Sequence, residues 1–188
     1  MTDTPLAIYK VLNADGFACH GGKGSWHLPN GKRPGKWMPE VKHIKPCERG
    51  YHLCEGTGDL VHWLGPVIYG AAWKGKRIRH EDKIVVSEAR LVSKCAHWTE
   101  HTARLFAASC ARDVLPIFEK ERPNDDRVRK CIEAVEAFAR GEVDRVVLNA
   151  AGAAARAAAG DAARAAARAK QARRLDHLLT TGEILLDV

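Results

Sequence analysis

The sequence lacks any apolar run near the roughly 18 residues that a membrane-spanning helix requires. Its start, MTDTPLAIYKVLNADG, also lacks the basic segment followed by an apolar segment that marks a signal peptide. These two absences predict a cytoplasmic protein with no membrane segment. Hydrophobic residues make up 46% of the 188 residues and charged residues 28%, a balance typical of globular domains. A chain of this length can bury the core of one large domain or of two small ones.

The six cysteines are spread along the chain and never form the closely spaced Cys-x2–4-Cys pair of common zinc sites. In a reducing compartment they are expected as thiols rather than disulfides. A looser zinc set remains an alternative, because adjacent strands could bring two segments of the front half together. Its members are Cys19, His20, Cys47, His52 and Cys54. The favoured prediction is that they are packed side chains, with no metal and no cofactor.

Positive charge is unevenly distributed over a formal net charge of +7. Residues 1–96 carry 15 Lys and Arg against 9 Asp and Glu, whereas residues 97–188 carry 15 against 14. The excess is greatest in KGSWHLPNGKRPGKWMPEVKHIK, residues 23–45. Such a segment suits an acidic partner, a nucleotide phosphate or a nucleic acid, but it is also typical of a basic soluble domain.

The front half, residues 1–96, predicts an α+β domain with a small, mainly antiparallel sheet and one short helix. Strands are expected in PLAIYKVL, at residues 41–44, at residues 51–54 and in DKIVVSEARLVSK. The segment VIYGAAWKGKRIRH predicts a hairpin that turns at Lys74-Gly75. Gly50 is expected at a positive φ in the turn before YHLC. GDLVHWLG predicts the short helix, with Asp59 as its N-cap.

The back half, residues 97–188, predicts an antiparallel helical bundle. Thr99 is expected to cap the first helix, which Pro116 should kink or divide. Asn124 or Asp125 should cap a second helix that closes at Gly141. The alanine-rich tail predicts one or two further helices with a break near residue 160.

Several short motifs of the back half occur together in one known family. They are the Cys-Ala step at 110–111, Leu-Pro-Ile-Phe at 115–118, PNDDRVR at 123–129 and the alanine-rich segment 150–173. In these motifs the C-terminal half resembles the immunity protein domain of bacterial polymorphic toxin systems. The resemblance implies an all-helical fold and a role in binding a toxin.

The front half is similar to an uncharacterised domain of phage and bacterial proteins. The motifs that carry this resemblance are YKVLNADG, GKWMPE, PCERGYHLCEGTGDLVHWLG and DKIVVSEARLV, between residues 8 and about 94. It implies no activity. Together the two resemblances favour a non-enzymatic accessory protein that binds a protein partner, of the immunity, antitoxin or phage counter-defence type.

An enzymatic alternative follows from the order of CHGG, GYHLC and VVSEARL along the front half. This order faintly resembles the ADP-ribosyltransferases, in which a His-Gly, a strand Tyr and a later strand Glu surround NAD. The resemblance implies that His20 holds the ribose, that Tyr51 stacks on nicotinamide and that Glu88 stabilises the developing positive charge. An exposed Glu88 paired with a neighbouring cation is the competing interpretation.

Partner contacts are expected in two places, because aromatic and Arg side chains anchor many interfaces. One is the basic loop, where tryptophans could also stack on nucleic-acid bases, although no recognised nucleic-acid-binding motif is present. The other is one face of the alanine-rich helices. The residues are Trp26, Lys32, Arg33, Trp37, Arg156, Arg164 and Arg168.

Overall fold

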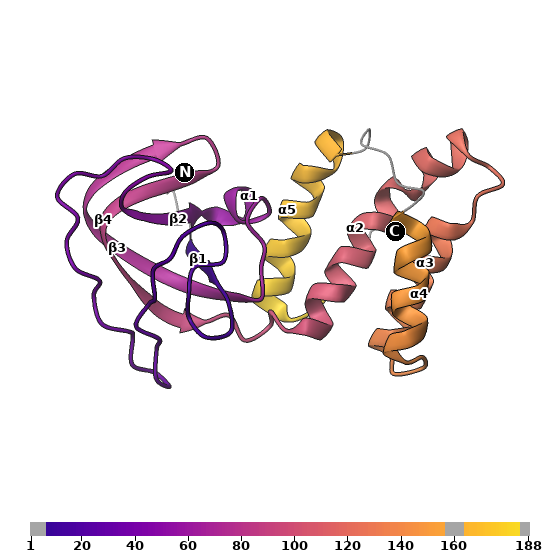
Figure 1. Cartoon of the computed structure of the whole chain (residues 1–188), viewed down its shortest axis with the longest axis horizontal. Coiled ribbons are helices and arrows are strands. Elements are labelled where there is room, and N and C mark those ends of the chain that lie inside the picture. The colour runs from indigo at the N-terminus through magenta and orange to yellow at the C-terminus, as the bar shows by residue number, and fades with distance from the viewer. Residues whose placement is uncertain (1–6, 157–163, 185–188) are drawn as a thin grey trace. The chain divides into compact units, whose positions relative to one another are not determined.

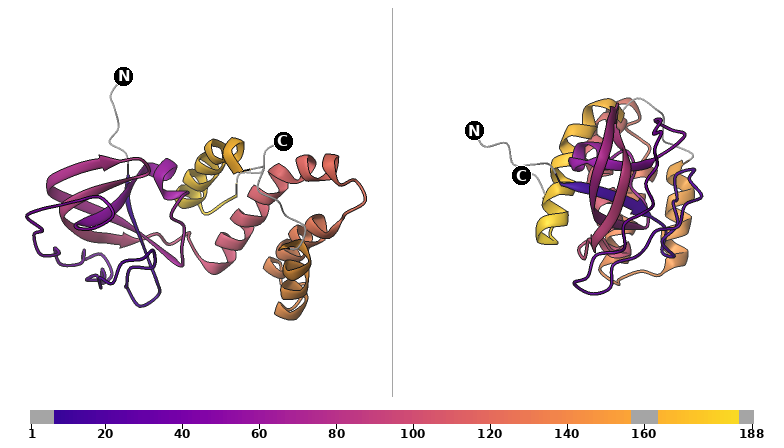
Figure 2. Two further views of the ribbon diagram at one scale, coloured as in Figure 1. Left: turned by 45° about the horizontal axis from the view of Figure 1, so that its top comes forward. Right: turned by 90° about the vertical axis from the view of Figure 1, so that its left-hand side faces the viewer.

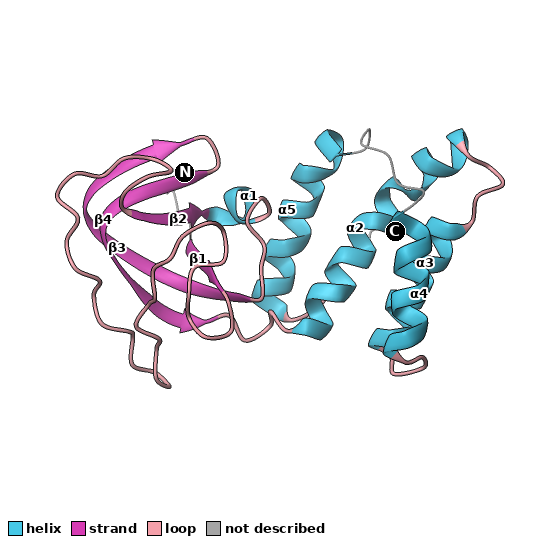
Figure 3. Cartoon of the chain, viewed as in Figure 1, coloured by secondary structure: helices cyan, strands magenta, loops and turns pink. Residues whose placement is uncertain are grey.

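The computed structural model describes the backbone of residues 7–156 and 164–184 and the side chains of the same ranges apart from 154–170 (Figure 1). The chain divides into two compact units, residues 1–98 and 99–188. The first is an antiparallel four-stranded sheet with a short helix, and the second holds four helices (Figure 3). The predicted α+β class is therefore confirmed.

The sheet of the first unit closes on itself in the order β1-β2-β4-β3, with every neighbouring pair antiparallel. Figure 2 shows its two long curved strands, β3 and β4, with the indigo-to-purple loop running beside them. Pairing between β1 and β2 is limited to two residue pairs. The strands are β1 (Ile8–Leu12), β2 (Tyr51–Glu55), β3 (Val67–His80) and β4 (Lys83–Lys94).

The hairpin turn predicted at Lys74-Gly75 is wrong, because β3 continues through these residues and the chain reverses at residues 81–82. The register with β4 shifts between Lys74 and Arg77, and Gly75 has a φ of +80°. One class of β-bulge places a glycine in the same left-handed conformation as a tight turn, so the glycine alone does not distinguish the two. The Ser87 hydroxyl fills the bulge and accepts the N–H of Lys76 at 2.9 Å.

The strand predicted at residues 41–44 is also wrong, since this segment is an irregular part of the long loop. The loop nevertheless follows the edge of β4. Every third loop residue donates its N–H to every second strand residue: Gly35 to Leu91, Met38 to Ala89 and Val41 to Ser87, at 2.8–2.9 Å. Pro34 and Pro39 lack an N–H, so a regular ladder cannot form here.

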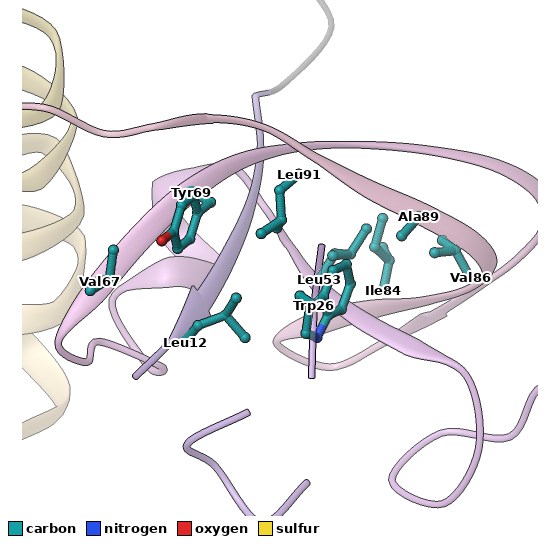
Figure 4. Close-up of a cluster of buried hydrophobic side chains, with 9 residues drawn as sticks. All are labelled: Leu12, Trp26, Leu53, Val67, Tyr69, Ile84, Val86, Ala89 and Leu91. Atoms are coloured by element: carbon teal, nitrogen blue, oxygen red, sulfur yellow. The ribbon is translucent and has the colours of Figure 1, made fainter. Parts of the chain in front are cut away.

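The main core of the first unit fills the closed sheet (Figure 4). All four strands contribute, and the long loop adds Trp26, which is only 9% exposed. A second tryptophan, Trp98, donates its indole N–H to the Gly65 carbonyl at 2.9 Å. The buried cluster consists of Leu12, Trp26, Leu53, Val67, Tyr69, Ile84, Val86, Ala89 and Leu91.

Helix α1 (Gly56–Leu60) begins one turn earlier than predicted, and its N-cap is Glu55 rather than Asp59. Asp59 still serves the start of the helix, because its carboxylate accepts the N–H of Glu55 at 2.8 Å. The buried carboxylate also forms a two-point ion pair with Arg79 of β3. This pair fastens the helix to the sheet, and the hydrogen bond to Asp59 raises the pKa of Arg79.

The second unit contains α2 (Glu100–Glu121), α3 (Arg127–Ala139), α4 (Arg145–Arg156) and α5 (Arg164–Thr181). Thr99 caps α2 in a capping box with Thr102, as predicted, and α2 runs through Pro116 undivided. The N-cap of α3 is Asp126 rather than Asn124 or Asp125. Gly141, at a φ of +77°, follows the C-cap of α3 as predicted. The break predicted near residue 160 lies outside the described residues.

Two contacts organise this unit. Ala108 and Leu115 of α2 pack with Ile132 of α3 in a small buried cluster. Arg174 of α5, only 3% exposed, donates to both carboxylate oxygens of Asp113 on α2, at 2.6 and 3.2 Å.

Within the described residues, no helix has the length and apolar character that a membrane crossing demands.

The bulge at Gly75 provides a test of the sheet. An added Cβ at Gly75 would lie 2.2 Å from Ser87 Oγ, whereas at Gly31, also at positive φ, it would meet nothing within 4 Å. We expect Gly75→Ala to cost about 2–4 kcal/mol, from backbone strain plus overpacking, and Gly31→Ala about 1 kcal/mol. All five tryptophans lie within residues 1–98, so tryptophan fluorescence during urea unfolding reports on this unit. Equal costs for the two variants would contradict the packing of Ser87 in the bulge.

Candidate functional site

The first unit contains a cavity of about 490 Å³, a size typical of small-molecule sites. Four segments that are distant in sequence form its wall. They are the loop 18–24, residues 9–11 of β1, the turn 47–50 and residues 51–54 of β2. Trp26, Met38, Trp63 and Lys83 complete the lining.

The cavity lies where β1 and β2 part. The strands pair only at Ile8–Glu55 and Tyr9–Cys54, after which β2 remains paired with β4 alone. The half-buried Lys10 spans the gap, since its ammonium donates to the His52 carbonyl at 3.1 Å. The same ammonium lies 5.2 Å from the centre of the Trp26 ring. Burial lowers the pKa of Lys10 below the usual lysine value.

His52 holds the turn that forms one edge of the cavity. Its Nε2 accepts the backbone N–H of Cys47 at 2.9 Å, and Cys47 has a φ of +63°, unusual for a residue with a side chain. Burial lowers the pKa of His52, and the charges of Lys10 and Lys83 lower it further. Gly50 has a φ of +119°, which confirms the positive φ predicted there.

The candidate zinc ligands Cys19, Cys47, His52 and Cys54 all line this cavity. Cys54 is buried, and burial raises the pKa of its thiol to about 12, so the thiol is held protonated. Over the described ranges, 7–156 and 164–184, no three His, Cys, Asp or Glu side chains come together as a group that could hold a metal ion. The predicted ligands therefore line the same cavity, but in the described residues they do not come close enough together to form a metal-binding group.

Two of the three residues of the NAD alternative line the cavity, His20 and Tyr51. His20 Nε2 donates to the Trp63 carbonyl at 2.8 Å, and the Tyr51 hydroxyl donates to the Pro39 carbonyl at 2.7 Å. Burial raises the pKa of Tyr51, and the charge of Glu88 adds to this rise. Glu88 itself is absent from the cavity lining and pairs with Lys74 at 2.9 Å.

The predicted partner contacts of the basic loop fall in different environments. Trp26 is buried in the core, and Trp37 is half-buried under Lys74 and Arg90, whose charges lie 4.9 and 4.7 Å from the centre of its ring. Exposed Lys32 and Arg33 lie at a turn that backbone hydrogen bonds close. The side chains of Arg156, Arg164 and Arg168, on α4 and α5, lie outside the described residues.

Sequence reasoning missed Lys10. The signal was present in Ile8-x-Lys10-x-Leu12, because alternate residues of a strand face the same side of a sheet. Ile8 and Leu12 both pack in the core, so the same face carries a lysine between them. A charged residue at such a position conflicts with the strand pattern, and such conflicts tend to mark functional sites.

The two units differ in what comparison with known proteins adds to this geometry. Residues 93–178 match the family described as Imm-5 like putative immunity protein. The C-terminal half is therefore similar to Imm-5-like domains. Neither a curated protein nor a solved structure matches the chain significantly. The Imm-5-like match covers residues 99–178 of the helical unit, whereas the similarity of residues 8–94 to an uncharacterised domain stays a prediction.

The environments of the cavity cysteines predict different reactivities. At pH 8 we expect the exposed Cys47 to react first with Ellman's reagent. Cys54 should stay inert in the folded chain, because it is buried and its thiol pKa is about 12. Cys47→Ser should therefore remove the fastest phase of the absorbance change, and Cys54→Ser should preserve it. Loss of that phase in Cys54→Ser would show that the thiol is accessible after all.

Proposed function

We propose that the protein binds a toxin and neutralises it without enzymatic chemistry, as an immunity or antitoxin protein, with the helical unit as the binding part. The observation that carries this proposal is the Imm-5-like match over residues 93–178. The family description supports immunity-type protein binding in general. A phage counter-defence role would use the same kind of contact with a different partner.

The exposed apolar side chains of α4 support a contact there. Val146 is 74% exposed and Val147 is 47% exposed, and they adjoin each other at the start of the helix. We call these two residues the α4 patch. Exposed valines of this kind gain free energy when a partner covers them, and apolar residues shielded from water dominate interface energetics. Arg145 beside the patch pairs with Glu100 at 3.3 Å and could contribute a polar rim.

The basic loop is a second proposed contact. Lys32 and Arg33 are exposed, and the front half carries a net charge of +6, so an acidic partner would be attracted to this unit. Such charges accelerate association more than they add affinity. We therefore assign the loop to steering and the α4 patch to affinity.

The NAD alternative gains only partial support. His20 and Tyr51 share the cavity, but the carboxylate that would stabilise the transition state is engaged with Lys74 outside its lining. Nucleic-acid binding gains no stacking platform from Trp26, which is buried. Toxin binding remains the function with the most support.

The proposal predicts a partner that is toxic alone and harmless with this protein. A tagged full-length chain is used to capture its partner from the source cells, and the captured protein is then expressed in a bacterial host. Growth should stop without this protein and resume when it is co-expressed. The double variant Val146→Lys/Val147→Lys should bind the captured protein at least about tenfold more weakly by calorimetry, a loss of about 1.4 kcal/mol.

A matched control is Phe17→Lys/Leu28→Lys, which places the same two charges on apolar residues of the other unit that are 47% and 43% exposed. Its affinity should equal that of the wild type. A captured protein that is not toxic, or whose toxicity persists with this protein present, would refute the immunity function. Unchanged affinity in the double variant would refute the α4 patch alone.

A further inference from the structure

Lys10 is a half-buried charge in the first unit that the toxin-binding proposal leaves unused. Its side chain leaves β1 on the core-facing side, between Ile8 and Leu12, and reaches the cavity through the gap between β1 and β2. Its ammonium has one hydrogen bond, to the His52 carbonyl, and rests near the Trp26 ring. Among the described residues no carboxylate forms an ion pair with it. An ammonium removed from water without a counter-ion is costly, so Lys10 is hard to explain by packing.

The remaining charges of the cavity do not compensate Lys10. Lys83 is already paired with Asp82 at 3.2 Å, and Glu48, a carboxylate in the lining, is paired with Lys45 at 2.6 Å. Lys23 also lines the cavity and forms no ion pair with any residue that the structure describes. The cavity therefore carries surplus positive charge, which favours an anionic ligand.

The rim of the cavity is suited to close approach by a phosphate. The loop Cys19-His-Gly-Gly-Lys-Gly24 forms one side, and an added Cβ at Gly21 or Gly24 would meet nothing within 4 Å. Gly21 has a φ of +79°. In the described parts of the chain, the backbone N–H groups of residues 21–23 donate to no other group. Free N–H groups of a glycine-rich loop beside ammonium groups are a recurring way of binding phosphate oxygens.

We propose that the cavity binds the phosphate group of a small phosphomonoester, with the Lys10 ammonium as its central contact and the glycine-rich loop as its rim. A phosphate carries up to two negative charges, which matches the two unpaired ammonium groups of Lys10 and Lys23. The volume of about 490 Å³ exceeds what a bare phosphate needs, so an organic group is bound with it. Trp26, Tyr51 and Met38 give that group an apolar wall.

Calorimetry on the full chain tests the site with three probes: inorganic phosphate, adenosine 5′-monophosphate and adenosine. Phosphate and the nucleotide should bind at millimolar concentrations or below, and adenosine should not. Lys10→Met should weaken binding of the nucleotide at least about tenfold, and Lys42→Met should leave it unchanged. Lys42 is exposed and outside the cavity lining, so the control removes the same charge elsewhere. Adenosine binding as tight as the nucleotide, no binding of either phosphate compound, or full binding by Lys10→Met would each overturn the proposal.

The stability of Lys10→Met distinguishes a ligand-binding role of Lys10 from a structural role. Because methionine fills similar space without a charge, Lys10→Met should unfold at an equal or higher urea concentration than the wild type by tryptophan fluorescence. A second measurement needs no variant: phosphate should slow acetylation of Lys10 in the wild-type chain, mapped by mass spectrometry, and leave Lys42 unaffected. Equal acetylation of Lys10 with and without phosphate would also overturn the site. We expect Lys10→Met to neutralise the toxin as well as the wild type does. A negative result for phosphate binding would therefore leave the proposed toxin binding by the helical unit unaffected.

Discussion

The two-residue pairing between β1 and β2 is the constraint on which the sheet unit depends. Closing only four strands leaves a narrow interior, so the strands cannot all stay paired along their length. The long pair β3 and β4 keeps its ladder by bulging at Gly75, whereas β1 and β2 separate after Tyr9–Cys54. The separation opens the cavity, and the Lys10 side chain crosses it to the His52 carbonyl. The cavity is thus a consequence of how the sheet closes.

Local signals in the sequence predicted the elements well where one physical rule dominates. Thr99 as an N-cap, Gly50 at a positive φ and Gly141 at the end of a helix follow from side-chain and backbone preferences that hold in most contexts. The turn predicted at Gly75 was wrong because one class of bulge places a glycine in the same backbone conformation as a tight turn. The burial of Trp26 could not be read from its basic, Gly- and Pro-rich surroundings, because the partners that bury it come from distant strands. Whether such a residue is buried depends on contacts with residues that are distant in the sequence.

The turn at residues 47–50 shows why metal-ligand residue types need not form a metal site. A histidine that binds a metal must offer a free ring nitrogen, but Nε2 of His52 already accepts the N–H of Cys47. Ligation through that atom would release a hydrogen bond that holds Cys47 in its left-handed conformation. Burial also raises the pKa of the Cys54 thiol to about 12. The hydrogen bond between His52 and Cys47 gives both residues a structural role in this turn.

The two units differ in how their charges are satisfied, and this difference assigns them different kinds of recognition. In the helical unit, cations are matched by nearby carboxylates, as in Arg112–Glu136, Arg140–Glu142 and the buried Arg174–Asp113. Exposed ion pairs contribute little free energy. A partner therefore gains more binding free energy by covering exposed apolar side chains such as Val146. In the sheet unit, Lys10 remains unpaired beside a cavity with an open glycine rim. A surface with matched charges and exposed valines suits a protein, whereas an unmatched ammonium in a cavity suits a small anion.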